Sequence, residues 1–167
     1  MSKNKYWTAV LYPENMIDTW ESDIGDIVQV PYAYCVHDAD MTESAERRKK
    51  HVHIILAFPN TTTYKHALSV FQKLSFAGLK ALNTCEPVIN IRHMYDYLIH
   101  NTEECRKKKK LIYDPSCRKT GNNFDIGSFE QISAAEKQDM CKELCDFIIN
   151  HGFTNFADFY VYATKGS

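Results

Sequence analysis

The first positions of this 167-residue chain that could do chemistry are two histidines separated by one residue, His51 and His53. On a β-strand, side chains two residues apart share a face and their backbones lie roughly 6.5–7 Å apart, so both imidazoles can reach one ion. The alternate positions are apolar and would face a core on the other side of the strand: Val52, Ile54, Leu56 and Phe58. By itself the pair is also compatible with two surface or stacked histidines, which is the more frequent outcome for such a pattern.

The segment before this pair adds a third imidazole and a carboxylate, at His37 and Asp40. If the polar stretch 41–50 is a long hairpin loop, the end of one strand lies beside the start of the next, where His51 stands. Three imidazoles and one carboxylate suit Mn²⁺, Zn²⁺, Co²⁺ or Ni²⁺, and suit Mg²⁺ less well. The alternative is a structural zinc site, but such sites are usually closed and rich in cysteine. The residues therefore predict a catalytic divalent-metal site.

A second polar group lies in the segment 92–101, which contains two tyrosines and two histidines. In a helix of about 3.6 residues per turn, four of its polar positions share one face. These positions are His93, Tyr97, His100 and Asn101. Tyr95 lies about 200° around the axis from Tyr97, among apolar side chains, so only one of the two tyrosines can face a polar site. We predict that Tyr97 is the functional tyrosine; the alternative is that both tyrosines pack in the core with their hydroxyl groups outward.

The composition limits the class of protein that carries these groups. With 44% hydrophobic and 25% charged residues, 6 glycines and 5 prolines, the chain is not disordered, collagen-like or of low complexity. No apolar stretch approaches the roughly 18–20 residues that a bilayer span needs, and the N-terminus has no secretory hydrophobic region. The six cysteines contain no CxxC pair and are interpreted as reduced thiols. We therefore expect a soluble cytoplasmic protein without a membrane partner.

The net charge of −1 conceals an uneven distribution. Residues 46–120 contain 15 lysines and arginines against 6 acidic residues, whereas the rest of the chain contains 5 against 15. The basic peaks are the runs 47–50 and 106–110, which suit phosphate neutralisation, although solvated loops are the alternative. The predicted phosphate-contacting residues are Arg47, Arg48, Lys49, Lys50, Lys107 and Lys108.

Periodicity and turn residues predict the elements that position these groups. Strands are expected at 6–12, 28–36, 51–58 and 86–90, with an edge strand at 111–113. Helices are expected at 14–22, at 64–76 behind a Thr62 or Thr63 cap, and at 92–102. After Gly121-Asn122-Asn123 the composition becomes acidic and aromatic. There a capping box of Ser133 and Glu136 predicts a helix to about Asn150, which Gly152 ends, and a second helix is expected at 154–162.

Several of these segments, taken in order and spacing, resemble the HUH (His-hydrophobic-His) endonucleases that initiate rolling-circle replication. The resemblance is to the RepB-like Rep proteins of small Gram-positive plasmids. Its motifs are Trp7 to Pro13, His37 to Asp40, His51 to His53 and Tyr95 to His100. The match covers residues 5 to about 126 and includes Asn122 to Ile126 at its end.

The resemblance implies an α+β fold in which helices flank a five-stranded antiparallel sheet. Residues 1–126 would form an origin-binding and nicking endonuclease domain, and 127–167 the start of a helical oligomerisation segment, truncated from a longer protein. Tyr97 would be the catalytic nucleophile. The implied metal ligands are His37, Asp40, His51 and His53, with Mn²⁺ favoured and Mg²⁺ or another divalent ion as alternatives.

The implied activity is metal-dependent nicking and joining of single-stranded DNA at a plasmid origin, like that of topoisomerase I, through a 5′-phosphotyrosyl intermediate. The implied partners are origin DNA, bound as a duplex and cleaved as a single strand, host helicase and polymerase, and further copies of the chain. Many HUH enzymes carry a lysine three or four residues after the tyrosine, where this chain has His100 and Asn101. The group that assists Tyr97 is therefore left open among the metal, His93, His100 and Asn101.

Two other classes of function fit the same residues. One is another HUH enzyme, a conjugative relaxase, a viral initiator or a small transposase, which would differ in the DNA that it recognises. The second is a non-catalytic, metal-stabilised DNA-binding regulator, whose binding would survive Tyr97→Phe. An RNA phosphodiesterase that used the histidines as acid and base would need neither metal nor Tyr97, and is less favoured.

Overall fold

The computed structural model describes residues 3–42, 44, 46–129, 134–155, 158–160 and 162. The chain divides into two compact units, Met1–Glu130 and Gln131–Ser167. The first unit contains a β-sheet with several short helices, and the second contains one long helix.

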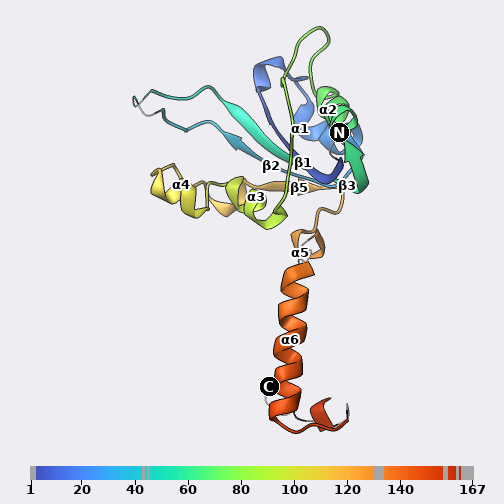
Figure 1. The fold of residues 1–167 in the computed structure, drawn as a ribbon. Coiled ribbons are helices and arrows are strands. Elements are labelled where there is room, and N and C mark those ends of the chain that lie inside the picture. Colours follow the sequence, from blue (N-terminus) through green and yellow to red (C-terminus); the bar gives the residue numbers. More distant parts are fainter. Residues whose placement is uncertain are drawn as a thin grey trace. The chain divides into compact units, whose positions relative to one another are not determined.

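The first unit is built on a five-stranded antiparallel sheet with helices, which confirms the predicted fold class (Figure 1). Its strands are β1 (Lys3–Leu11), β2 (Tyr32–His37), β3 (His51–Thr63), β4 (Glu86–Pro87) and β5 (Lys119–Gly121). Their order in the sheet is β4-β1-β3-β2-β5, and every neighbouring pair is antiparallel. The long central strand β3 thus lies between β1 and β2, and carries the His51–His53 pair.

The helical elements follow the strands in chain order. They are η1 (Pro13–Asn15), α1 (Trp20–Val28), α2 (Tyr64–Gln72), α3 (Ile91–Tyr97), α4 (Glu103–Lys107), η2 (Pro115–Cys117) and α5 (Ile126–Phe129). Helices α1 and α2 cover one face of the sheet, and α3 lies on the other (Figure 1).

Alternation along β3 divides the core into two clusters, one on each face of the sheet. Val52, Ile54 and Leu56 pack under α1 and α2. Ile55 and Ala57 pack on the opposite face with Ile91, Leu98 and Ile99. His51 and His53 have the same parity as Ile55, so they project from the face that α3 covers. The apolar alternation predicted for this strand is confirmed.

Helix α2 begins where the sequence predicts it. The side chain of Thr63 accepts a hydrogen bond from the backbone N–H of His66, as an N-cap does. Ala67, Val70 and Phe71 are buried against the sheet. The helix ends at Gln72, earlier than the expected residue 76.

The first α-helix lies later in the chain than the predicted range 14–22. Trp20, Ile24 and Val28 are spaced four residues apart and bury one face of α1. Val28 therefore ends a helix instead of continuing into a strand over 28–36, and β2 begins only at Tyr32. The β-branched Val28 favours a strand by its residue type, but its position on the buried face of α1 places it in the helix.

Strand β3 continues beyond Pro59, which was expected to end it at residue 58. The register with β1 shifts there, because Ala57 pairs with Tyr6 whereas Thr62 pairs with Asn4. Pro59 thus lies in an irregular, exposed part of the strand, where the missing N–H costs no ladder hydrogen bond.

The predicted edge strand at 111–113 is absent from the described sheet, whose fifth strand is β5. The backbone of 111–113 bonds elsewhere: the Leu111 carbonyl accepts from the His100 ring, and the Tyr113 N–H donates to Ile99 O. The apolar run Leu111-Ile112-Tyr113 has strand composition, but its polar groups are used by the turn that follows α3.

The second unit contains α6 (Ala134–Asn150), in the range where a helix was predicted. Gly152 follows it with φ 67° and donates its N–H to Ile149 O, as expected for a glycine that ends a helix. Ser133 and the side chain of Glu136, the predicted capping box, lie outside the described residues, as does part of the predicted helix 154–162. Within the described part of the chain, no helix has the length and apolar character needed to cross a membrane.

Candidate metal centre and nucleophile

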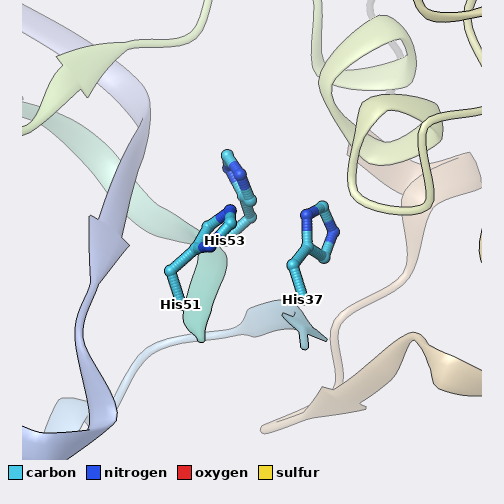
Figure 2. A group of neighbouring side chains, drawn as sticks. All are labelled: His37, His51 and His53. Atoms are coloured by element: carbon cyan, nitrogen blue, oxygen red, sulfur yellow. The ribbon is translucent and has the colours of Figure 1, made fainter. Parts of the chain in front are cut away.

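The β2–β3 hairpin brings the three predicted histidine ligands together. His37 pairs directly with His51 across the ladder, and His53 stands opposite Cys35. Figure 2 shows the three rings as neighbours, with His51 and His53 from β3 and His37 from β2. One ligand nitrogen of each histidine lies within 4.8 Å of the others, which is the spacing a shared ion requires.

Asp40, three residues beyond the end of β2, places its carboxylate against this group. Its Oδ2 lies 3.3 Å from His37 Nδ1 and 3.7 Å from His51 Nε2. Its Oδ1 accepts a hydrogen bond of 2.8 Å from the Tyr113 hydroxyl. Burial by itself would raise the pKa of Asp40, but the Tyr113 hydrogen bond and the nearby histidines lower it below its ordinary value. The carboxylate is therefore ionised and directed toward the imidazoles.

Backbone carbonyls fix the tautomers of three imidazoles. A carbonyl oxygen can only accept a hydrogen bond, so the ring nitrogen that faces it carries the proton and the other nitrogen keeps its lone pair. The pairs are His37 Nε2 with Leu98 O at 2.7 Å, His51 Nδ1 with Lys49 O at 2.8 Å, and His100 Nδ1 with Leu111 O at 2.9 Å. The buried His37 Nδ1 and His100 Nε2 have no hydrogen-bond partner among the described residues. Such unpartnered lone pairs are what a metal ion would satisfy.

Burial also favours the neutral form of His37, His53 and His100. Burial, together with the neighbouring histidines, lowers the pKa of His37 to about 4 and that of His53 to about 2. It lowers the pKa of His100 as well. A metal ion binds the neutral imidazole, so this group would need no deprotonation at neutral pH. The donor set therefore fits a divalent ion held by His37, Asp40, His51 and His53.

His100, which the sequence predicts as a possible helper of Tyr97, lies in the same group as a further candidate ligand, a position that the sequence did not predict. It forms a second set of close ligand atoms with His37 and Asp40, and its ring centroid lies 4.4 Å from that of His37. The predicted helix 92–102 ends at Tyr97, and His100 has a left-handed backbone with φ 58°. The helical face predicted for 93, 97, 100 and 101 is therefore wrong, because a turn directs His100 inward.

Tyr97, at the end of α3, lies beside the histidine group. Its ring centroid is 5.5 Å from that of His53 and 5.6 Å from that of His100. Tyr95 faces away, as predicted: it packs against the second core cluster and stacks on Phe124, and the Arg118 guanidinium lies 4.0 Å from its ring centroid. The two tyrosines thus have different surroundings, and only Tyr97 borders the histidines.

The other two predicted helpers are farther from this chemistry. The Asn101 side chain is exposed and accepts a hydrogen bond from Arg106. His93 is half-exposed, with its Nε2 3.9 Å from a Glu104 carboxylate oxygen. His93 does line a cavity of about 540 Å³ that Tyr97 and His53 also line. The cavity extends from the site to β1 and residues 83–86.

Comparisons with known proteins identify the family of the chain. The family model described as "Plasmid replication protein, origin binding domain" matches residues 1–127. The chain belongs to this family. It is 32% identical over 162 residues to Replication protein RepB of Streptococcus agalactiae, with 95% of this chain and 75% of that protein covered.

Two further relatives have lower identity over similar lengths. Replication protein RepB of Lactiplantibacillus plantarum is 23% identical, with 96% of this chain and 68% of that protein covered. Replication protein of Staphylococcus aureus is 21% identical, with 98% and 77% covered. The chain is thus a RepB-like plasmid replication initiator.

Two residues of this initiator's site were not predicted individually. Tyr113 donates to Asp40 and accepts the Ala39 N–H, and burial raises the pKa of its hydroxyl. Lys110 donates a hydrogen bond of 3.2 Å to the Tyr97 hydroxyl. Tyr113 is part of the apolar run 111–113, and Lys110 is part of the basic run 106–110. No local pattern distinguishes either from its neighbours.

Some of the basic residues predicted to contact DNA bind other residues of the chain through their side chains. Three have intramolecular partners: Arg47 donates to Asp38 O, Lys49 pairs with Glu14, and Lys107 pairs with Glu103. All six are exposed, including the other three, Arg48, Lys50 and Lys108. DNA contact by any of the six stays a prediction.

Proposed function

We propose that this initiator nicks one strand of its plasmid origin by a metal-dependent transesterification with Tyr97 as the nucleophile. The observation that supports it most is the position of the Tyr97 phenol, which borders a group of neutral imidazoles and one carboxylate with unpartnered lone pairs. A structural metal site would not need a hydroxyl nucleophile at its edge.

The steps follow from the residues at the site. When bound by His37, Asp40, His51 and His53, a divalent ion, Mn²⁺ favoured, supplies positive charge that polarises the non-bridging oxygens of the scissile phosphate. The Tyr97 oxygen attacks the phosphorus, and the bond to the 3′ oxygen breaks. The products are a free 3′-OH and a 5′-phosphotyrosyl link, which conserves the bond energy so that the strand can be rejoined.

The cavity beside Tyr97 supports a single-stranded substrate. Its volume of about 540 Å³ leaves room for an unpaired nucleoside next to the phenol. A base within a duplex is stacked and paired, and would have to leave the helix to enter such a space. We therefore infer that the strand is cleaved after local opening of the origin.

A supercoiled plasmid that carries the origin tests the proposal. We expect nicked and relaxed DNA with Mn²⁺ and intact DNA with EDTA, together with a covalent protein–oligonucleotide adduct on a denaturing gel. Tyr97→Phe should abolish the adduct, whereas Tyr95→Phe, whose ring faces away, should retain it. Wild-type nicking by Tyr97→Phe would refute the nucleophile, and binding without cleavage at an origin active in cells would favour the regulator.

We also propose that the segment 127–167 mediates self-association, that host polymerase extends the 3′-OH and that host helicase separates the strands. Exposed apolar side chains on α6, Leu144 and Ile149, support an interface there. Leu144→Glu should lower the mass of the particle in light scattering. An unchanged mass would argue against α6 as the interface.

A further inference from the structure

The inference concerns Lys110 and rests on the proposed role of Tyr97 as nucleophile. Lys110 is the last residue of the basic run 106–110. It is half-buried, whereas residues 106–109 are exposed. Because Lys110 is partly buried while its basic neighbours are exposed, we expect a specific contact to hold its side chain against the protein.

That contact is with the oxygen that would react. Lys110 Nζ lies 3.2 Å from the Tyr97 hydroxyl and 5.2 Å from the centroid of its ring. An ammonium group only donates hydrogen bonds, so the phenol oxygen accepts. A positive charge is therefore directed at the atom on which negative charge would develop during attack.

The backbone on both sides of Lys110 is fixed. After α4, Lys109 takes a left-handed conformation with φ 50°, its N–H donates to Arg106 O, and the Lys110 N–H donates to Cys105 O. This is the Schellman pattern that ends a helix. On the other side, the Leu111 carbonyl accepts from the His100 ring. The lysine is thus held between a helix cap and the site itself.

We propose that Lys110 is a catalytic residue that holds the Tyr97 oxygen and stabilises its negative charge during attack on the scissile phosphate. The phenol proton passes to solvent, the oxygen–phosphorus bond forms, and the bond to the 3′ oxygen breaks with its electron pair. The 3′ oxygen then takes a proton from solvent. Lys110 neither gains nor loses a proton in these steps. The proton that the phenol releases to solvent is balanced by the proton that the 3′ oxygen takes from solvent.

Single-turnover cleavage of an origin oligonucleotide at saturating protein tests this role. Lys110→Met should slow cleavage about 100-fold, because it removes a donor aimed at the charged atom. Its Kd for the oligonucleotide should stay within about threefold of the matched control Lys65→Met, which removes an exposed charge on α2. Lys110→Arg, which keeps the charge, should recover part of the rate.

A modified substrate separates an action on the nucleophile from one on the leaving group. An oligonucleotide with sulfur in place of the bridging 3′ oxygen releases a thiolate, which needs no proton to depart. If Lys110 acts on Tyr97, the ratio of wild-type to Lys110→Met rates persists with this substrate. Loss of the ratio would assign Lys110 to the leaving group and overturn the proposed role.

The outcomes also separate this inference from the proposed function. A wild-type adduct that requires Tyr97, with unchanged cleavage by Lys110→Met, overturns the role of Lys110 alone. A wild type that cleaves nothing overturns both. If Lys110→Met does not fold by circular dichroism, Lys110→Arg and Lys110→Gln replace it. The arginine variant should be the faster, and equal rates would overturn the role.

Discussion

The β2–β3 hairpin and the segment 97–113 opposite it contribute to one site but are held in different ways. In the hairpin, a continuous antiparallel ladder places His37 against His51 and leaves His53 on the same face. In the segment 97–113, single hydrogen bonds at turns and a helix cap place His100 and Lys110. In a ladder, many backbone hydrogen bonds together fix the position of a side chain, whereas in a turn only a few hydrogen bonds do so. We therefore expect changes in the hairpin to remove ligands outright, and changes in the segment to alter geometry by degrees.

The largest effect should come from the hairpin. His53→Ala removes one lone pair from a preformed donor set, so Mn²⁺ binding measured by calorimetry should weaken by more than about 100-fold. His66→Ala is the matched control, because His66 lies on α2 at the other face of the sheet. Equal losses in the two variants would show that the strand pair does not form the metal site.

A smaller effect is expected on the opposite side of the site. Tyr113→Phe removes the hydrogen bond that orients Asp40, and Mn²⁺ affinity should fall about 10-fold. Tyr64→Phe serves as the control, since the Tyr64 hydroxyl contacts Thr84, which lines the cavity but does not belong to the group of candidate metal ligands. If the two variants bind Mn²⁺ equally well, Asp40 does not depend on the segment that carries Tyr113.

Acidification should destabilise the metal-free protein through the buried imidazoles. Burial lowers the pKa of His37 from 6.5 to about 4, so between these values the unfolded chain binds more protons than the folded one. This contribution to the free energy of unfolding is complete above pH 6.5 and is lost as the pH falls toward 4. The melting temperature in EDTA should drop by about 5 °C or more over that range. His37→Gln should flatten the dependence, and an unchanged slope would contradict a buried neutral His37.

The smallest effects should be alike in the two regions. Arg48 lies in the hairpin loop between β2 and β3, Lys108 follows α4, and both are exposed. Replacing either with alanine should weaken origin binding about threefold and reduce the slope of log Kd against log salt by about one. A loss confined to one variant would show that DNA runs along one side of the site only.

The same difference explains how much the sequence could predict. Alternation along residues 51–58 and the hairpin that returns to His37 are local patterns, and they indicated the sheet and the juxtaposition of the imidazoles. No local sequence pattern indicates the left-handed turn at His100. The residue is not a glycine, and its ring is hydrogen-bonded to the carbonyl of Leu111, eleven residues later. Lys110 and Tyr113 likewise acquire their partners only when this turn closes. Tertiary contacts there override the helical period that was expected to continue to residue 102.

The hydrogen bond between His37 Nε2 and Leu98 O links the two regions at one peptide group. Leu98 immediately follows Tyr97, so the carbonyl that orients the His37 ring belongs to the residue next to the proposed nucleophile. A pull on the tyrosine by a covalently joined strand would be transmitted through that carbonyl to the His37 ring. A displacement of the Tyr97 backbone would therefore change the direction in which the His37 lone pair points.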